Sequence, residues 1–143
     1  MIFLDSDALI GFLRGTPEMA ALLAKNKTEL FAIPSPVLFE VYYGIFFPQI
    51  SPRFSQNKKL LDRLAKEHKR LIQFLNDVNI FDMNILSIKR SAKISAELDS
   101  QGKHIGEFNS LIAGIVLEYG YDTIVTNNTK HYENVPNLTI LNF

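Results

Sequence analysis

The sequence contains no cysteine and no tryptophan, and its 15 basic and 15 acidic residues cancel to a formal net charge of zero. The absence of cysteine excludes disulfides, thiolate zinc sites and a cysteine nucleophile. Because the chain has no net charge, no overall field draws it to nucleic acid, and RNA binding must depend on a local patch. No apolar run approaches the ~20 residues of a membrane helix, and the N-terminus lacks the basic segment of a signal peptide. These absences favour a soluble cytoplasmic protein.

The chain has 143 residues, of which 47% are hydrophobic, and this suits one domain over residues 1–143. Segments typical of strands and of helices alternate along it. This alternation predicts an α/β fold, with a mostly parallel five-stranded sheet covered by helices on both faces. A site in such a sheet forms at the carboxyl ends of the strands. The expected strands cover residues 2–4, 30–33, 78–81, 123–125 and 138–141, and the expected helices 6–13, 17–27, 35–47, 56–76, 84–100 and 107–119, with a loop over 48–55.

Two acidic residues are notable for their positions. Asp5 directly follows the first expected strand, which suits a metal-binding carboxylate and a helix N-cap equally well. Glu40 is the only charged residue between Glu29 and Arg53, in a helix that is otherwise apolar. An unpaired buried carboxylate is costly and attracts a cation, so Glu40 is expected to point into a polar site. The alternative is a single exposed glutamate on a mostly buried helix.

Three further polar residues lie near the expected strand ends. Glu107 falls in the first turn of an apolar helix, where an acid also suits the helix dipole. Asn109 follows at the start of the same helix. Asn128 comes after the fourth expected strand, where it is a candidate site residue or a simple turn residue. None of the three identifies a site by itself.

Basic residues concentrate in one stretch, since seven of the 15 lysines and arginines fall between residues 53 and 70. The ordinary interpretation is a solvated helix face. The sharper one is a patch for the RNA backbone, in which Lys59, Arg63 and Lys66 would contact phosphates. The seven residues are Arg53, Lys58, Lys59, Arg63, Lys66, Lys69 and Arg70.

Apolar residues crowd the segment around the expected loop, where few should occur. Exposed apolar patches of this kind mark contact surfaces. We therefore expect a homodimer. The residues are Ile45, Phe46, Phe47, Ile50 and Phe54.

Four segments together resemble a known family. They cover residues 3–10, 39–44 and 105–113, and then 124–128 with Tyr132. Each is weak alone, but the four in this order and spacing resemble the PIN-domain family over essentially the whole chain. Within that family the resemblance is to the VapC-like ribonuclease toxins of type II toxin–antitoxin systems.

The resemblance implies a three-layer PIN-like fold and a metal-dependent endoribonuclease, the toxin of a toxin–antitoxin pair. It implies an RNA substrate, a cognate antitoxin as partner, and Mg²⁺ or Mn²⁺ as cofactor, for which carboxylate oxygens are suitable ligands. By the resemblance, the metal ligands are Asp5, Glu40 and Asn109, and the catalytic positions are these three with Asn128.

Asn109 departs from the family pattern, which has an aspartate there. An amide oxygen still coordinates a cation, but the negative charge is lost, so metal binding and RNA cleavage should be weak. Asp7 and Glu107 are candidates to compensate in part. Two alternatives follow: a catalytically inactive PIN-fold module that binds RNA or a partner, or a phosphatase of the haloacid-dehalogenase type, suggested by Asp5 and Asp7 after an apolar strand.

Overall fold

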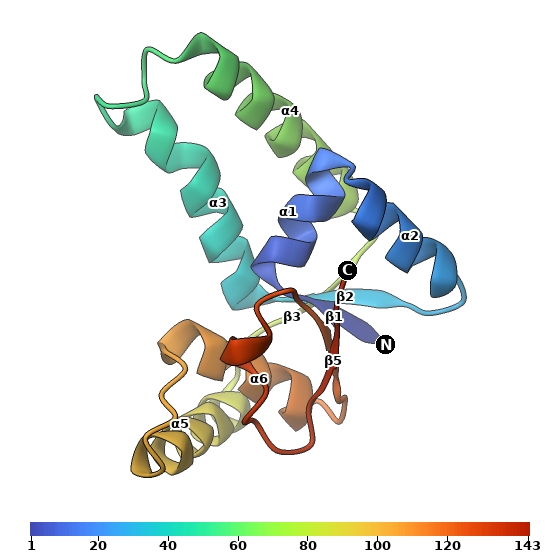
Figure 1. The fold of residues 1–143 in the computed structure, drawn as a ribbon, viewed down its shortest axis with the longest axis vertical. Helices are drawn as coiled ribbons and strands as arrows, with labels where there is room; N and C mark the ends of the chain where they lie inside the picture. The colour runs from blue at the N-terminus through green and yellow to red at the C-terminus, as the bar shows by residue number, and fades with distance from the viewer.

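Five parallel strands form one sheet, with β1 at its centre and the order β3-β2-β1-β4-β5 (Figure 1). The computed structural model describes all of residues 1–143. Every neighbouring pair of strands is parallel, as expected from the alternation of strands and helices. The predicted α/β fold class is confirmed. The strands are β1 (Ile2–Leu4), β2 (Phe31–Pro34), β3 (Asn79–Phe81), β4 (Thr123–Val125) and β5 (Thr139–Leu141).

Six α-helices connect the strands, and most of them begin or end at a residue suited to that role. The side chain of Thr16 accepts from the Met19 N–H at the start of α2, and Asn84 forms a capping box with Ser87 at the start of α5. None of the helices is both long and apolar enough to cross a membrane. The helices are α1 (Ser6–Arg14), α2 (Pro17–Lys25), α3 (Ser35–Ile50), α4 (Lys58–Phe74), α5 (Ile85–Ser100) and α6 (Glu107–Glu118).

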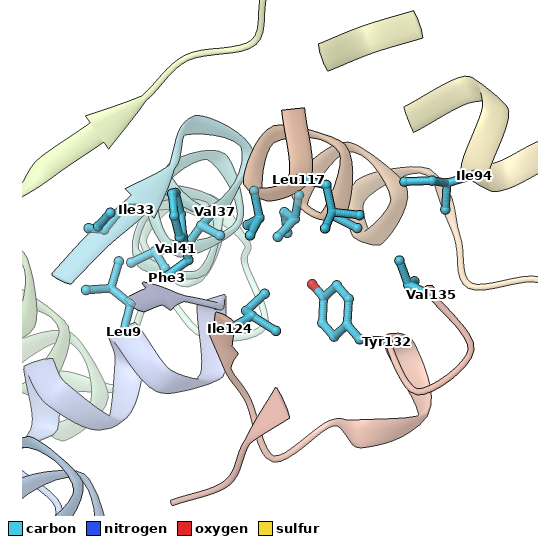
Figure 2. Close-up of a cluster of buried hydrophobic side chains, with 14 of the residues drawn as sticks. Phe3, Leu9, Ile33, Val37, Val41, Ile94, Leu117, Ile124, Tyr132 and Val135 are labelled. Atoms are coloured by element: carbon cyan, nitrogen blue, oxygen red, sulfur yellow. The ribbon is translucent and has the colours of Figure 1, made fainter. Parts of the chain in front are cut away.

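The helices form layers on the two faces of the sheet (Figure 1). Because successive strand residues point to opposite faces, Ile2 and Leu4 pack with α1 and α2, whereas Phe3 faces the larger core. That core includes Ile124 of β4 and residues of α3, α5 and α6 (Figure 2). Helices α3 and α4 extend beyond the sheet as a pair. The layers therefore leave the carboxyl ends of β1 and β4 beside the first turns of α1, α3 and α6.

Helix α3 is longer than expected from the sequence. It continues through Pro48 to Ile50, so the prediction of a loop over 48–55 is wrong for its first three residues. Pro48 lacks an N–H and normally ends a helix. Here aromatic side chains four residues apart stack along the helix, Tyr42 on Phe46 and Tyr43 on Phe47. Of the apolar residues expected in and around the loop, all but Phe54 therefore lie on α3.

Helices α5 and α6 pack closely, and this fixes the first turn of α6. A Cβ on Gly114 would lie 1.8 Å from the Ser91 Oγ and 2.8 Å from the Ser87 carbonyl oxygen, so only glycine fits. The Ser95 and Ser110 hydroxyls are hydrogen-bonded across the same seam at 2.5 Å. This contact places Glu107 and Asn109 at the edge of the sheet where β1 ends.

Candidate active site at the strand ends

Asp5 lies at the carboxyl end of the central strand and is 2% exposed. Its Oδ1 accepts from the Ser6 N–H at 2.8 Å, and its Oδ2 accepts from the Thr126 hydroxyl at 3.1 Å. The N-cap interpretation of Asp5 is thus confirmed. The N-cap does not exclude a metal-binding role for Asp5, because the carboxylate also faces the residues that follow β4.

Asp7 joins the same region from the first turn of α1. Its Oδ2 accepts from the Asn127 N–H at 2.8 Å and from the Asn128 Nδ2 at 3.3 Å. The same oxygen lies 3.3 Å from the Thr126 hydroxyl, whose one proton is donated either to Asp7 or to Asp5. Its Oδ1 is buried and has no hydrogen-bond donor. Asn128 therefore contacts the site through Asp7 and, by its own N–H, through the Thr126 hydroxyl at 3.0 Å.

Glu40 reaches the cluster from α3. Its Oε1 is buried and has no donor, which argues against the alternative of a simple exposed glutamate. Burial raises the pKa of Glu40, and the negative charges of Asp5 and Asp7 raise it further, while the Ser6 hydroxyl partly offsets them. The lone charge of this apolar helix is thus directed at the other carboxylates.

Asn109 and Glu107 point in different directions from the first turn of α6. The Asn109 Nδ2 donates to the Ile105 carbonyl oxygen at 2.6 Å, and its Oδ1 accepts from the Tyr132 hydroxyl at 3.4 Å. Glu107 is exposed. The pKa of His104 is raised mainly by its hydrogen bond to Asp99, and the Glu107 charge adds to the effect. Asn109 therefore belongs to the cluster, whereas the charge of Glu107 acts on His104 at the surface.

Two further residues of the site belong to the fourth segment of the family resemblance but were not predicted as site residues. Thr126 is fully buried, and its hydroxyl lies between Asp5 and Asp7. Tyr132 is also fully buried, and its hydroxyl lowers the pKa of Asp5 by hydrogen bonding. The available signal was the strand order, because β4 neighbours β1 and residues that follow one must meet residues that follow the other.

The electrostatics of the cluster favour a cation. Burial raises the pKa of Asp5 and the charge of Asp7 raises it further, although Ser6, Thr126 and Tyr132 donate to the carboxylate. No three acidic, histidine or cysteine side chains are gathered as a ready ligand set. The fit to a cation rests on the two buried oxygens without donors, one on Asp7 and one on Glu40. Hard divalent cations take such oxygens as ligands.

The basic residues lie elsewhere, at the start of α4. The α3–α4 pair extends away from the sheet, and its far end holds the first turn of α4 (Figure 1). Lys59, Arg63 and Lys66 line a hollow of about 570 Å³. Arg63 also forms an ion pair within the fold, since its Nε lies 3.6 Å from the Glu67 Oε1. Arg70 donates to the Leu13 carbonyl oxygen at 2.6 Å and packs on a ring of α1. The predicted patch is therefore partly structural.

An apolar groove of about 660 Å³ runs along the outer side of α3. All of its side chains except Ile50 are aromatic, all except Tyr42 are exposed, and Phe39 also packs on Phe108 of α6. The prediction of a contact surface is wrong for Ile45, because this residue is 2% exposed and belongs to the core. The lining residues are Phe39, Tyr42, Tyr43, Phe46, Phe47 and Ile50.

Comparison with known proteins gives matches over nearly the whole chain. The family model of the PIN domain matches residues 2–137. The chain is 34% identical over 122 residues to ribonuclease VapC2 of Rickettsia felis, covering 85% of this chain and 79% of that protein. It is 35% identical over 135 residues to the tRNA(fMet)-specific endonuclease VapC of Shigella flexneri, covering 94% and 92%.

A solved structure matches as well. The crystal structure of VapBC2 from Rickettsia felis, bound to a DNA fragment from their promoter, aligns with a TM-score of 0.73 and 28% identity. The alignment covers 100% of this chain and 99% of that one. DNA-bound VapBC from Salmonella typhimurium aligns with a TM-score of 0.74 at 22% identity, which is a likeness of fold alone.

Proposed function

This chain belongs to the PIN domain family, and from that premise we propose that it is a metal-dependent endoribonuclease, the toxin of a toxin–antitoxin pair. The observation that carries the proposal is the presence of Asp5, Asp7 and Glu40 at the strand ends, with two buried carboxylate oxygens that lack donors. The relatives named as ribonuclease and endonuclease support the same reaction class. Such a protein would act on RNA in the cytoplasm.

Asp5, Glu40 and Asp7 would hold Mg²⁺ or Mn²⁺, with the Asn109 amide oxygen as a neutral donor. When bound, the cation neutralises phosphate oxygens and lowers the pKa of a water molecule toward neutrality. The protein's own part is to fix the ligands. Thr126 and the Ser6 N–H hold Asp5 in one orientation.

Asn128, predicted as a catalytic position, would act through Asp7, to which its Nδ2 donates. Asn127 holds the same Oδ2 by its main-chain N–H. Together they leave Asp7 Oδ1 as the free oxygen. Glu107 is proposed only as an accessory charge, since it lies at the surface.

The decisive test is Asn109→Asp. One added charge at ~4 Å from a cation is worth on the order of a few kcal/mol at an effective dielectric near ~20. A part of that energy corresponds to about tenfold in affinity. We expect the variant to bind Mn²⁺ at least about tenfold more tightly, to cleave RNA faster, and to slow growth of cells that express it. The assay is ribonuclease rate against metal concentration.

The matched control is Asn26→Asp. The Asn26 Nδ2 also donates to the carbonyl oxygen four residues earlier, that of Leu22, at 2.9 Å, but it lies at the end of α2. It should change neither metal affinity nor rate. Asp5→Asn added to Asn109→Asp should abolish the gained activity. If Asn109→Asp behaves like Asn26→Asp, Asn109 is not a metal position.

A second candidate function, supported by Asn109 itself, is a PIN-fold module without catalysis that binds RNA or a partner. It predicts that the unmodified chain binds RNA with no metal-dependent cleavage at any Mn²⁺ concentration. Membership in the PIN family removes the haloacid-dehalogenase-type phosphatase from consideration.

For RNA binding, we propose that Lys59 and Lys66 contact the phosphate backbone, with Arg63 in a lesser role because it pairs with Glu67. Each phosphate contact adds ~0.7 to the salt slope for single strands. Lys59→Glu with Lys66→Glu should weaken RNA affinity and flatten its salt dependence, without change in melting temperature. An unchanged salt slope would show that these lysines form only a solvated face.

For partners, we propose a homodimer and a cognate antitoxin, with the groove on α3 as a contact surface. A toxin–antitoxin complex from Klebsiella pneumoniae has a similar fold, with a TM-score of 0.69 at 18% identity, which supports the antitoxin. Ile50→Glu, at a residue 79% exposed, should disrupt association without unfolding the chain. Ile72→Glu on α4, 54% exposed, is the control. Light scattering alone and with an antitoxin measures both, and equal behaviour of the two variants would exclude the groove.

A further inference from the structure

Tyr132 is the largest side chain that is completely buried in the protein. It follows the short 3₁₀ turn Thr129–His131, and its ring packs in the core with Ile124 and Val135 (Figure 2). A phenylalanine would fill this volume equally well. A buried hydroxyl needs a partner, and that of Tyr132 lies at 3.4 Å from the Asn109 Oδ1. It is also near enough to the Asp5 carboxylate to lower the pKa of Asp5.

Two hydrogen bonds hold the Asn109 side-chain amide in one orientation, and Tyr132 forms one of them. At one end, Nδ2 donates to the Ile105 carbonyl oxygen at 2.6 Å. At the other end, Oδ1 accepts from Tyr132. The reversed amide would place two acceptors, Oδ1 and the Ile105 oxygen, against each other. The amide oxygen is therefore directed toward Tyr132.

The same hydroxyl connects two of the proposed ligands. A phenol has one proton, so it donates to Asn109 or to Asp5 but not to both at once. Asp5 already accepts from the Ser6 N–H and from Thr126, whereas the Asn109 Oδ1 has only Tyr132. A neutral amide oxygen is a weak ligand for a cation, and its orientation decides whether it contributes.

We propose that Tyr132 is a positioning residue, whose hydroxyl orients the oxygens of Asn109 and Asp5 for a divalent cation. This inference rests on the proposed function. It adds a role for one hydroxyl group that the rest of the fold does not require. Hydrogen bonds to metal ligands from the surrounding shell typically change metal affinity by about 10–100-fold.

The test is Tyr132→Phe, which removes one oxygen and keeps the ring. We expect it to weaken Mn²⁺ binding about tenfold, measured from the electron paramagnetic resonance signal of free Mn²⁺. The control is Tyr121→Phe, which removes the hydroxyl of a half-buried tyrosine packed on Phe3 and Phe81. Melting temperatures with EDTA show whether either variant loses structure.

Both variants are made in the unmodified chain and in Asn109→Asp, where binding should be tighter. A loss with Tyr132→Phe, absent from Tyr121→Phe and from the EDTA melting curves, supports the proposal. Equal Mn²⁺ affinity of Tyr132→Phe and its parent overturns it while leaving the proposed function intact. Absence of Mn²⁺ binding in every form overturns the proposed function and this inference together.

Discussion

Two regions of the molecule bury acidic side chains and treat them differently. In the seam between α1 and α4, the Glu67 Oε1 lies 2.8 Å from the Arg14 Nε and 3.6 Å from the Arg63 Nε. At the strand ends, Asp5 is buried more deeply, yet no lysine, arginine or histidine pairs with it. Arginine side chains thus pair with Glu67, whereas Asp5 has only uncharged hydrogen-bond donors.

The difference teaches what each region is for. Glu67 fastens α4 to α1, and its charge is compensated within the chain. The strand-end acids keep a surplus of negative charge and two oxygens without donors. A charge left uncompensated costs stability unless something from outside compensates it. Such local frustration is expected at functional sites.

Breaking the seam should give the largest effect on stability. Arg14→Met leaves Glu67 with the more distant Arg63 alone. Fully buried pairs lose ~3–5 kcal/mol on such a change. Since the Arg14 side chain is 44% exposed, we expect about 2 kcal/mol in urea unfolding. Arg90→Met, which breaks a pair to Glu118 at 3.4 Å, should cost less than about 1 kcal/mol. Equal losses would mean that burial of Glu67 is irrelevant.

Neutralising an acid should have opposite signs in the two regions. In EDTA at neutral pH, Glu67→Gln should destabilise the protein, whereas Asp5→Asn should stabilise it, because the folded state favours the uncharged form of Asp5. The measurement is chemical unfolding of both variants and the parent. Destabilisation by Asp5→Asn would show that Asp5 is compensated in the fold.

The strand-end acids should also make the metal-free protein less stable as the pH rises. The folded-state pKa values of Asp5 and Glu40 lie above their ordinary values of 3.8 and 4.5. Their contribution to stability is therefore complete below those values and declines as the pH rises through the raised values. We expect unfolding free energies in EDTA to show this decline, and the double variant Asp5→Asn with Glu40→Gln to lack it.

Addition of Mg²⁺ also tests how the charges of Asp5 and Glu40 affect the free energy of unfolding. A cation bound only by the folded state raises stability by mass action. It should therefore restore the stability of the parent at neutral pH and leave the double variant unchanged. A Mg²⁺ effect of equal size in both proteins would place the cation elsewhere.

The smallest effect should come from Arg63→Gln. The side chain is 54% exposed and its Nε lies 3.6 Å from Glu67, so we expect a loss of about 0.5 kcal/mol or less. Lys59→Gln, which removes a neighbouring charge of the same hollow, is the control and should leave stability unchanged. A loss as large as that of Arg14→Met would make Arg63 an equal partner of Glu67.

Most of the helices and strands were predictable, because the periodic spacing of apolar residues and the helix-capping residues are local features of a sequence. The strand at 2–4, and the helices that begin after the cap residues Thr16 and Asn84, can each be predicted from a few neighbouring residues. The end of α3 differs from the prediction, because the helix continues through Pro48 to Ile50 although proline is a local stop signal.

The acids of the candidate site were predictable by type, and their partners were not. Glu40 stood out as a lone charge in an apolar helix, and its Oε1 is buried. Thr126 and Tyr132 are ordinary residue types whose roles depend on β4 lying beside β1. Arg63 resembled any surface arginine until the structure placed it on Glu67. Contacts over such sequence separations follow from topology.

The placement of β4 beside β1 has a consequence for biosynthesis. Asp5 and Asp7 leave the ribosome early, but the hydroxyl of Thr126 follows 121 residues after Asp5, and Tyr132 comes later still. At ~5–20 residues per second, this interval lasts on the order of 10 seconds. During it the nascent chain has no strand to pair on that side of β1. The carboxylates are assembled only when translation of the domain is nearly complete, so a ribosome that stalls midway releases a fragment without the site.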